Sequence, residues 1–410
     1  MSILNFLDNL KSRGVIIGAS HDNELEQYLS EGSRVFYVGF DPTADSLHIG
    51  SLFQLVTIKR FIDAGHKPIV IVGGGTAAIG DPSGRTEMRN MLDAVTLDHN
   101  KTALTRQIQN ILKQPQLTLL DNATWLGDLH YIDFMRDFGV HFKINQLIKK
   151  DIYRDRLERE EGLTMLELNY ICFQAFDFYY LHKNYGCTLQ LGGSDQWSNM
   201  LAGSELIQKK TGSKAFVAIE PLITRSDGKK MGKSADGAIW LDPGRTSPFE
   251  FYQYWLNIPD SDVEPFFRYF TFLELDQIQE VLSGGIIPAK RRLASEITQF
   301  VHGAKQLSDA QEKTDQLFGG KDITSLSDLP TIKIVVDASH ARVDWLKTLA
   351  QAGLFGSNRN VRELITSGSL YIDGKKLSPN DADDLNNITA MPETKRILRV
   401  GKKQHYRLVL

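Results

Sequence analysis

The chain has 410 residues, more than one hydrophobic core usually accommodates, so two or three domains are expected. Its hydrophobic fraction of 42% and charged fraction of 24% are ordinary for a globular protein, and no uncharged apolar run is long enough for a membrane span. The net charge of −3 argues against a protein that coats nucleic acid.

The charge is unevenly distributed along the chain. Residues 341–410 hold twelve Lys and Arg against seven Asp and Glu, whereas the first 340 residues hold 35 against 43. A basic end on an acidic body suits a polyanion that docks at that end, although a solvated surface would give the same balance.

The cysteines and the first residues indicate a compartment. Cys172 and Cys187 both lie in apolar surroundings, so a disulfide is not expected and a reducing cytosol fits. Residues 1–14 carry charges within an amphipathic pattern and lack the apolar block of a signal peptide. Without HExxH or CxxC spacing, the sequence predicts no metal site formed by the protein alone.

Residues 1–33 are predicted to be helical, and the stretch 34–64 then combines a strand with a helix. Val35–Phe40 is β-branched and aromatic without charge, which is typical of a buried strand. The apolar spacing that follows predicts a helix that begins at Asp45 and Ser46 and stops at Gly65.

The start of this helix predicts a nucleotide site. A helix N-terminus offers unpaired N–H groups and partial positive charge, which suit phosphate. We expect His48 in the first turn with its ring facing that phosphate, and Gly50 as a surface for a flat purine, because glycine has no side chain.

Pro68–Val72 predicts a second buried strand. Strand, helix and strand form the unit of a doubly wound parallel sheet, which binds ligands at the carboxyl ends of its strands. The glycine-rich residues 73–84 follow, and Asp81 within them is placed where a carboxylate would meet an ammonium group. A plain loop is the alternative for this glycine cluster.

Residues 85–160 are predicted to be mostly helical and to interrupt the sheet. The next predicted helix, Leu163–Tyr180, carries Tyr170, Gln174 and Asp177 at i, i+4 and i+7, within an arc of about 60°. The residues around this polar stripe are apolar. An exposed helix edge would more often carry Lys and Glu, so we favour a stripe that faces a binding cleft over one that faces solvent.

Two further strands are predicted at Thr188–Leu191 and within Ala215–Thr224. Glycines and a polar cluster at 192–196 follow the first strand, which indicates another ligand loop. The second precedes the basic segment 226–234, whose lysines are compact charges suited to phosphate. A solvated basic turn is the usual meaning of such a run, but its place after the final strand favours phosphate.

The sequence pattern changes in the last part of the chain. Pro248–Gly303 predicts amphipathic helices rich in aromatic residues, broken at Pro259, Gly284 and Pro288, and residues 319–340 have the composition of a linker. After this stretch, two short helices are predicted at Val343–Ala352 and Val361–Ser367. A hairpin follows, with the strands Leu370–Ile372 and Lys375–Leu377 on either side of the turn Asp373-Gly374, and Arg399–Leu410 is predicted to form the closing strands.

Two distant motifs together carry a family resemblance. His48-Ile49-Gly50-Ser51 and Lys230-Met231-Gly232-Lys233-Ser234 resemble the HIGH and KMSKS signatures of class I aminoacyl-tRNA synthetases. The flanking segments YVGFDPT at 37–43 and GGSDQW at 192–197 narrow the resemblance to tyrosyl-tRNA synthetases of the bacterial type, over almost the whole chain. In one departure, Ser51 stands where the first signature usually has a second His, so we expect it to contribute less than His48.

The resemblance implies a fold and a domain organisation. It implies a Rossmann-like, doubly wound α/β catalytic domain over residues 1–245, with the helical insertion at about 85–160 forming a homodimer contact. A helical anticodon-binding domain over 246–325 and a small α+β RNA-binding domain over 341–410, similar to a ribosomal protein, would follow.

The resemblance also implies the roles of individual residues. Tyr37 and Asp177 would meet the phenol hydroxyl of tyrosine, and Asp81, Tyr170 and Gln174 its ammonium group. A site built to bond a hydroxyl rejects phenylalanine, because its own polar groups would be left unpaired. ATP or the adenylate would meet a larger set: Gly39, Asp41, His48, Gly50, Ser51, Asp195, Gln196, Lys230, Lys233 and Ser234.

The implied reaction activates L-tyrosine with ATP and transfers it to tRNA(Tyr). Thr43, His48, Lys230 and Lys233 would position the reactants and neutralise charge on the leaving pyrophosphate, with Mg²⁺ bridging the phosphates. A tryptophan-specific synthetase is one alternative, which the pair Tyr37 and Asp177 argues against. A non-catalytic RNA-binding protein is another, which the intact motif residues argue against.

Overall fold

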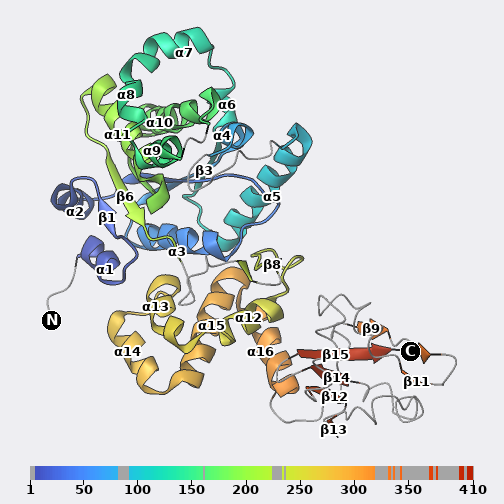
Figure 1. Ribbon diagram of the computed structural model, residues 1–410. Helices are drawn as coiled ribbons and strands as arrows, with labels where there is room; N and C mark the ends of the chain where they lie inside the picture. The colour runs from blue at the N-terminus through green and yellow to red at the C-terminus, as the bar shows by residue number, and fades with distance from the viewer. Residues whose placement is uncertain are drawn as a thin grey trace. The chain divides into compact units, whose positions relative to one another are not determined.

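The computed structural model describes residues 5–81, 92–159, 162–223, 233–234 and 237–318, and short segments between 331 and 409 (Figure 1). The chain forms two compact units, Met1–Ser308 and Asp309–Leu410. Among the helices that the structure describes, none has both the length and the apolar character that a bilayer crossing requires.

A six-stranded sheet organises the first unit, in the order β1-β6-β5-β2-β3-β4. All neighbouring strands are parallel except β1 and β6. The strand order reverses between β2 and β5, and such a switch point is where doubly wound sheets bind ligands. The predicted fold class is confirmed. The strands are β1 (Gly18–Ala19), β2 (Val35–Phe40), β3 (Lys67–Val72), β4 (Thr118–Asp121), β5 (Cys187–Gly193) and β6 (Phe216–Glu220).

Helices cover both faces of this sheet, with α3 on one side and α10 and α11 on the other (Figure 1). Buried side chains of α10, α11 and the central strands form a core that contains both free cysteines. The helical elements up to residue 211 are α1 (Phe6–Ser12), α2 (Asp22–Ser30), α3 (Ile49–Asp63), α4 (Gly74–Ile79), α5 (Ala94–Leu112), α6 (Ala123–Leu126), α7 (Tyr131–Asp137), η1 (Gly139–His141), α8 (Ile144–Leu147), α9 (Asp151–Glu158), α10 (Met165–Tyr185), η2 (Ser194–Gln196) and α11 (Trp197–Thr211).

The predicted start of α3 was wrong by several residues. The helix begins at Ile49, and His48 is its N-cap rather than a first-turn residue. The expected start residues are bonded elsewhere: Asp45 pairs with Arg245 at 2.6 Å, and the Ser46 hydroxyl donates to the carbonyl of Leu47 at 2.8 Å. Their side chains therefore do not cap the helix.

One alternative and one prediction for the first unit need correction. The plain loop that was the alternative for the glycine cluster does not apply to Gly74 and Gly75, which belong to the short helix α4. The segment 85–160 is mostly helical in its described residues but also contributes β4, which pairs with β3 at the edge of the sheet and was not predicted. The polar stripe lies on α10, whose Thr164 and Glu167 form a capping box.

The remaining helices of the first unit follow in the chain. They are α12 (Pro248–Leu256), α13 (Asp260–Phe270), α14 (Leu275–Ser283) and α15 (Ile286–His302), and α16 (Ala304–Phe318) continues into the second unit. One of them, α13, contacts α3. Pro259 and Gly284 mark helix ends as predicted, but Pro288 lies in the first turn of α15, where proline is tolerated. The buried Arg60 of α3 donates to the carbonyls of Arg268 and Thr271 at 2.8 and 2.7 Å.

The described part of the second unit contains a five-stranded sheet in the order β13-β12-β14-β15-β9 and a separate pair, β10 with β11. β9 lies within the stretch predicted as a linker, so that interpretation was wrong for these residues. The two short helices predicted in this unit lie outside the described residues, apart from Val343. The strands are β9 (Thr331–Lys333), β10 (Val336–Asp337), β11 (Arg342–Val343), β12 (Leu370–Ile372), β13 (Lys375–Lys376), β14 (Ile397–Val400) and β15 (Gln404–Val409).

Candidate active site

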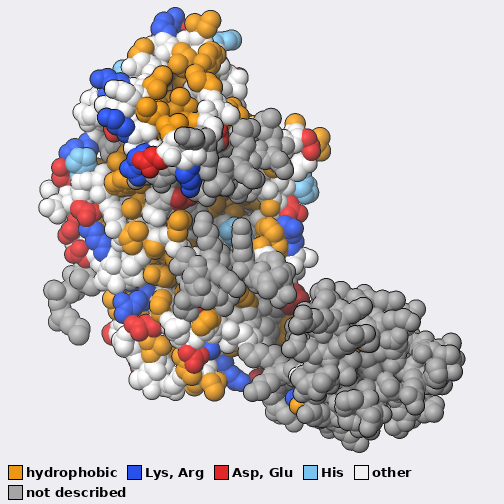
Figure 2. Space-filling view, viewed as in Figure 1, with side chains coloured by type: hydrophobic (Ala, Val, Ile, Leu, Met, Phe, Trp, Pro, Cys, Tyr) orange, Lys and Arg blue, Asp and Glu red, His pale blue; other side chains and the backbone are white. Residues whose placement is uncertain are grey.

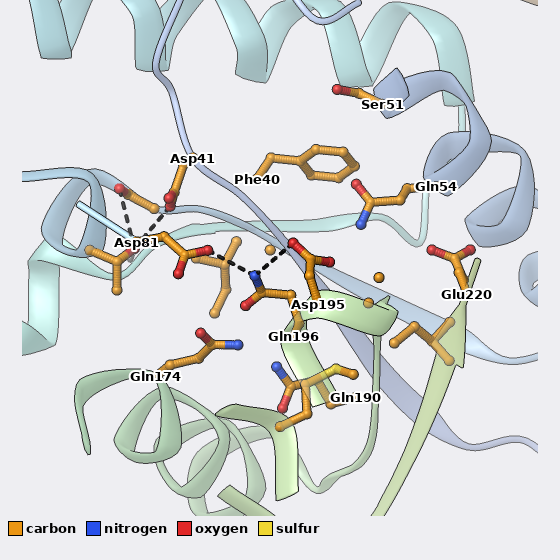
Figure 3. Close-up of a pocket in the computed structure, with 18 of the residues that line it drawn as sticks. Phe40, Asp41, Ser51, Gln54, Asp81, Gln174, Gln190, Asp195, Gln196 and Glu220 are labelled. Atoms are coloured by element: carbon orange, nitrogen blue, oxygen red, sulfur yellow. Dashed lines mark hydrogen bonds between the residues drawn. The ribbon is translucent and has the colours of Figure 1, made fainter. Parts of the chain in front are cut away.

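A cavity of about 430 Å³ lies at the carboxyl ends of β2, β5 and β6 (Figure 3). Loops after three strands and the first turns of α3 form its wall. It brings together thirteen of the sequence-predicted site residues: Tyr37, Gly39, Asp41, Thr43, His48, Gly50, Ser51, Asp81, Tyr170, Gln174, Asp177, Asp195 and Gln196.

The remaining predicted residues belong to the basic segment. Lys230 lies outside the described residues. Lys233 and Ser234 form the short strand β7 (Lys233–Ser234), which pairs antiparallel with β8 (Gly237–Ala238). Only the backbone of these two residues is described, so their proposed contacts with phosphate stay predictions.

Asp177 is buried at one end of the cavity, with 3% of its surface exposed. Its Oδ1 accepts a hydrogen bond from the indole Nε1 of Trp125 at 2.7 Å, and its Oδ2 accepts one from the amide of Asn122 at 2.9 Å. Burial raises the pKa of Asp177 to about 7, although both hydrogen bonds favour the ionised form. Asp177 is therefore held in one orientation.

Three polar atoms of residues that line the cavity, among them the Tyr37 hydroxyl beside Asp177, are buried without a partner in the described part of the chain. The hydroxyl of Tyr37 has no hydrogen-bond partner among the described residues, nor do the Oε1 atoms of Gln174 and Gln190. Burial and then the charge of Asp177 raise the pKa of Tyr37 well above its usual value. An unpaired buried polar atom costs free energy unless a ligand bonds it, so this end of the cavity fits a polar group on an otherwise apolar ligand.

Several residues of this region were missed by the sequence analysis. Asn122 follows the unpredicted strand β4; it donates to Thr76 at 3.0 Å and accepts from the N–H of Gly75 at 2.8 Å. Thr76 in turn donates to Asp41 at 3.3 Å. Gln190 is a single polar residue inside a buried apolar strand, which was a usable signal for a site.

Two carboxylates on the cavity wall share one amide (Figure 3). The Nε2 of Gln196 donates to Asp81 at 2.8 Å and to Asp195 at 3.4 Å, while its Oε1 accepts from Asn199 at 3.1 Å. These bonds join the loop after α4 to η2 and α11. The resulting pair of acidic groups suits a cationic or hydroxyl-rich part of a ligand.

The other end of the cavity lies at the N-terminus of α3. The Nδ1 of His48 accepts a hydrogen bond from the N–H of Gly50 at 2.9 Å, which caps the helix. Ile49 donates to the carbonyl of Ile239 at 3.0 Å and Leu241 donates to that of Leu47 at 2.8 Å. The segment that follows the basic motif is thus bound directly to the first motif.

Gly39 leaves room at the wall of the cavity. A Cβ placed on this residue of β2 would have no atom within 4 Å. A glycine in a buried strand with open space at that position permits close approach of a ligand to the backbone. Among the described residues, no group of three or more His, Cys, Asp or Glu side chains could hold a metal ion.

Comparisons with known proteins agree with this geometry. A family profile described as tRNA synthetases class I (W and Y) matches residues 30–319. A tyrosine–tRNA ligase of Caldanaerobacter subterraneus subsp. tengcongensis is 42% identical over 412 residues, covering 99% of this chain and 100% of the relative. One from Clostridium tetani is 41% identical over 415 residues, covering 99% of each chain.

A solved structure is similar as well. The C-terminally truncated mitochondrial tyrosyl-tRNA synthetase of Aspergillus nidulans matches with a TM-score of 0.70 and 28% identity, over 77% of this chain and 95% of that one. The family profile covers most of the chain, and the curated relatives match along its whole length. This chain therefore belongs to the class I aminoacyl-tRNA synthetases, in the family of bacterial-type tyrosyl-tRNA synthetases.

Proposed function

We propose that this protein activates L-tyrosine with ATP, giving tyrosyl-adenylate and pyrophosphate, and then transfers tyrosine to the 3′ end of tRNA(Tyr). The observation that carries this proposal is the buried hydroxyl of Tyr37, which has no partner among the described residues and lies beside the fixed carboxyl of Asp177. The pair lines the same cavity as the N-terminus of α3.

Tyrosine would enter with its ring between the apolar walls and its hydroxyl toward Tyr37 and Asp177. Each carboxyl oxygen of Asp177 accepts one hydrogen bond from the protein and has capacity for another. Phenylalanine would leave these buried groups unpaired, which disfavours its binding. Asp81, Tyr170 and Gln174 would then receive the ammonium group.

The first step is an in-line displacement at phosphorus. A carboxylate oxygen of tyrosine forms a bond to the α-phosphorus, and the bond between that phosphorus and the bridging oxygen of the β-phosphate breaks. Pyrophosphate leaves with the electron pair. Thr43, His48, Lys230, Lys233 and the N–H groups at the start of α3 would hold the phosphates and stabilise the developing charge.

Mg²⁺ would accompany the nucleotide and neutralise part of the phosphate charge. Gly39, Asp41, Asp195 and Gln196 would position the ribose and the rest of the adenylate. In the second step the terminal hydroxyl of the tRNA attacks the tyrosyl carbonyl, and AMP leaves. No described side chain is needed as a covalent nucleophile.

The test is amino-acid-dependent exchange of pyrophosphate into ATP by the full chain. We expect tyrosine to support exchange and tryptophan and phenylalanine to fail. Exchange with tryptophan instead would establish the tryptophan-specific alternative. A folded protein that exchanges with none of the three would favour the non-catalytic alternative.

We further propose a cytosolic homodimer that binds tRNA with residues 246–325 and 341–410. Support for the dimer is a group of apolar side chains, each more than half exposed: Tyr131, Ile132, Val140, Ile144 and Met165. Figure 2 shows hydrophobic side chains gathered toward the end of the unit where α7 lies. Exposed apolar clusters of this kind mark contact sites. Light scattering that finds a monomer at micromolar concentration would contradict the dimer.

A further inference from the structure

The last residue of β6, Glu220, is a buried acid on the cavity wall to which the sequence analysis assigned no role. Only 2% of its surface is exposed, and it lines the cavity. Its carboxyl group is hydrogen-bonded to Thr57 of α3, while its Oε1 has no partner among the described residues. One carboxyl oxygen is therefore available to a ligand in the cavity.

Glu220 lies at the nucleotide end of the cavity. Figure 3 places Gln54 and Glu220 on one side, away from Gln174 and Asp81. Gln54 and Thr57 continue the face of α3 that begins with Gly50, because these residues are spaced i, i+4 and i+7. A purine lying against Gly50 would thus direct one edge toward Glu220.

The free oxygen accepts hydrogen bonds in either protonation state of Glu220. The single proton of the Thr57 hydroxyl can go to the carbonyl of Phe53, which lies 3.1 Å away, or to Glu220. If Glu220 is ionised, both of its oxygens are acceptors. If it is neutral, its O–H can donate to Thr57 and its carbonyl oxygen remains an acceptor.

We propose that Glu220 accepts a hydrogen bond from the 6-amino group of adenine and so determines the specificity for ATP. Adenine carries a donor at this position, whereas guanine and hypoxanthine carry a carbonyl oxygen, which would face an acceptor. A buried acceptor left without a donor disfavours binding, so purines without the amino group are selected against. This inference rests on the proposed function, because it assigns a residue to the nucleotide of that reaction.

The test uses tyrosine-dependent pyrophosphate exchange with ATP and with purine riboside 5′-triphosphate, which differs only by lacking the 6-amino group. In the wild-type chain we expect the KM for the analogue to be about tenfold higher than that for ATP. In Glu220→Leu the KM for ATP rises to that of the analogue and their ratio approaches one. The KM for tyrosine stays within about twofold.

Glu220→Gln is the matched control, because its amide can donate to Thr57 and still present a carbonyl oxygen to the cavity. We expect it to keep the tenfold ratio. Equal KM values for both nucleotides in the wild-type chain would overturn the proposal without any variant having to fold. An unchanged ratio in Glu220→Leu, or its loss in Glu220→Gln, would overturn it as well. A wild-type chain without tyrosine-dependent exchange would instead refute the proposed function.

Discussion

The indole nitrogen of Trp125 donates a hydrogen bond to the carboxyl of Asp177 across 2.7 Å, although the two residues lie on different helices. The ring of Trp125 also stacks on Tyr180, with centroids 4.4 Å apart and planes 13° from parallel. Both contacts join α6 to α10 directly behind the proposed tyrosine site. Trp125 therefore orients Asp177 without lining the cavity.

Replacing Trp125 with Phe should weaken tyrosine binding selectively. Phenylalanine keeps an aromatic ring against Tyr180 but removes the hydrogen bond to Asp177, which is worth on the order of 1.4 kcal/mol. We expect the KM for tyrosine in pyrophosphate exchange to rise about tenfold, while the KM for ATP is unchanged. Trp197→Phe, at a tryptophan packed against the same core, is the control and should leave both KM values unchanged. A normal tyrosine KM in Trp125→Phe would exclude this positioning role.

His48 should matter more than Ser51 in forming the adenylate. We expect His48→Ala to lose at least about tenfold more rate than Ser51→Ala in pyrophosphate exchange, because the imidazole ring is the longer donor. His48→Ala also removes the cap of α3, which costs about 1 kcal/mol.

His48→Asn separates these two effects. Asparagine is a strong helix cap but lacks the imidazole ring. This variant should therefore melt near the wild-type temperature, yet its rate of pyrophosphate exchange should fall as in His48→Ala. Equal rate losses in His48→Ala and Ser51→Ala would reject the ranking. Full activity in His48→Asn would mean that the cap alone matters.

The buried Glu220 should make stability depend on pH. Burial raises its pKa from 4.5 to about 7, so between these values the folded state keeps a proton that the unfolded state has lost. Unfolding then releases a proton, and this contribution to the free energy of unfolding falls as pH rises through the window. Glu220→Gln does not titrate, so its stability relative to the wild type should grow between pH 5.5 and 8.

Urea denaturation at the two pH values measures this difference. A fully buried group with this shift changes the free energy of unfolding by roughly 1.4 kcal/mol per pH unit within the window, or on the order of 2 kcal/mol here. Glu280→Gln, on the exposed side of α14, should show no such growth. If the difference in free energy of unfolding between Glu220→Gln and the wild type is the same at both pH values, the carboxyl of Glu220 is not the titrating group.

Truncation tests the proposed role of the second unit. β9 pairs with β15, so a cut near residue 340 would split the five-stranded sheet. A chain that ends at Phe318 removes the whole sheet and keeps α16. We expect this chain to form adenylate at the wild-type rate but to charge tRNA poorly. Charging that survives at physiological salt would show that the tRNA is anchored elsewhere.

The sequence predicted those parts of the site that depend on local spacing. Tyr170, Gln174 and Asp177 share a helix face because the helical period fixes it, and all three line the cavity. His48 and Gly50 follow β2 in the chain, so they had to lie at its carboxyl end. The parallel strands β2 and β3 were equally recognisable from apolar runs, and β5 from a mostly apolar run that contains Gln190.

Residues that act through tertiary contacts could not be predicted in this way. Trp125 and Asn122 are hydrogen-bonded to Asp177 although more than fifty residues separate each of them from it in the sequence. The strand that precedes them, β4, has no purely apolar run. The start of α3 was misplaced because Asp45 and Ser46 are good caps locally, yet distant residues bind them. Glu220 stands out locally as the lone charged residue of an apolar strand, but its partner Thr57 lies on another element, so its contacts could not be predicted.

The helix cap at His48 also fixes the tautomer of its ring. Because Nδ1 accepts the N–H of Gly50, the proton of the neutral imidazole must reside on Nε2. The ring then offers an N–H on its outer nitrogen whether or not it carries a positive charge. Adenylate formation should therefore not require an imidazolium ion.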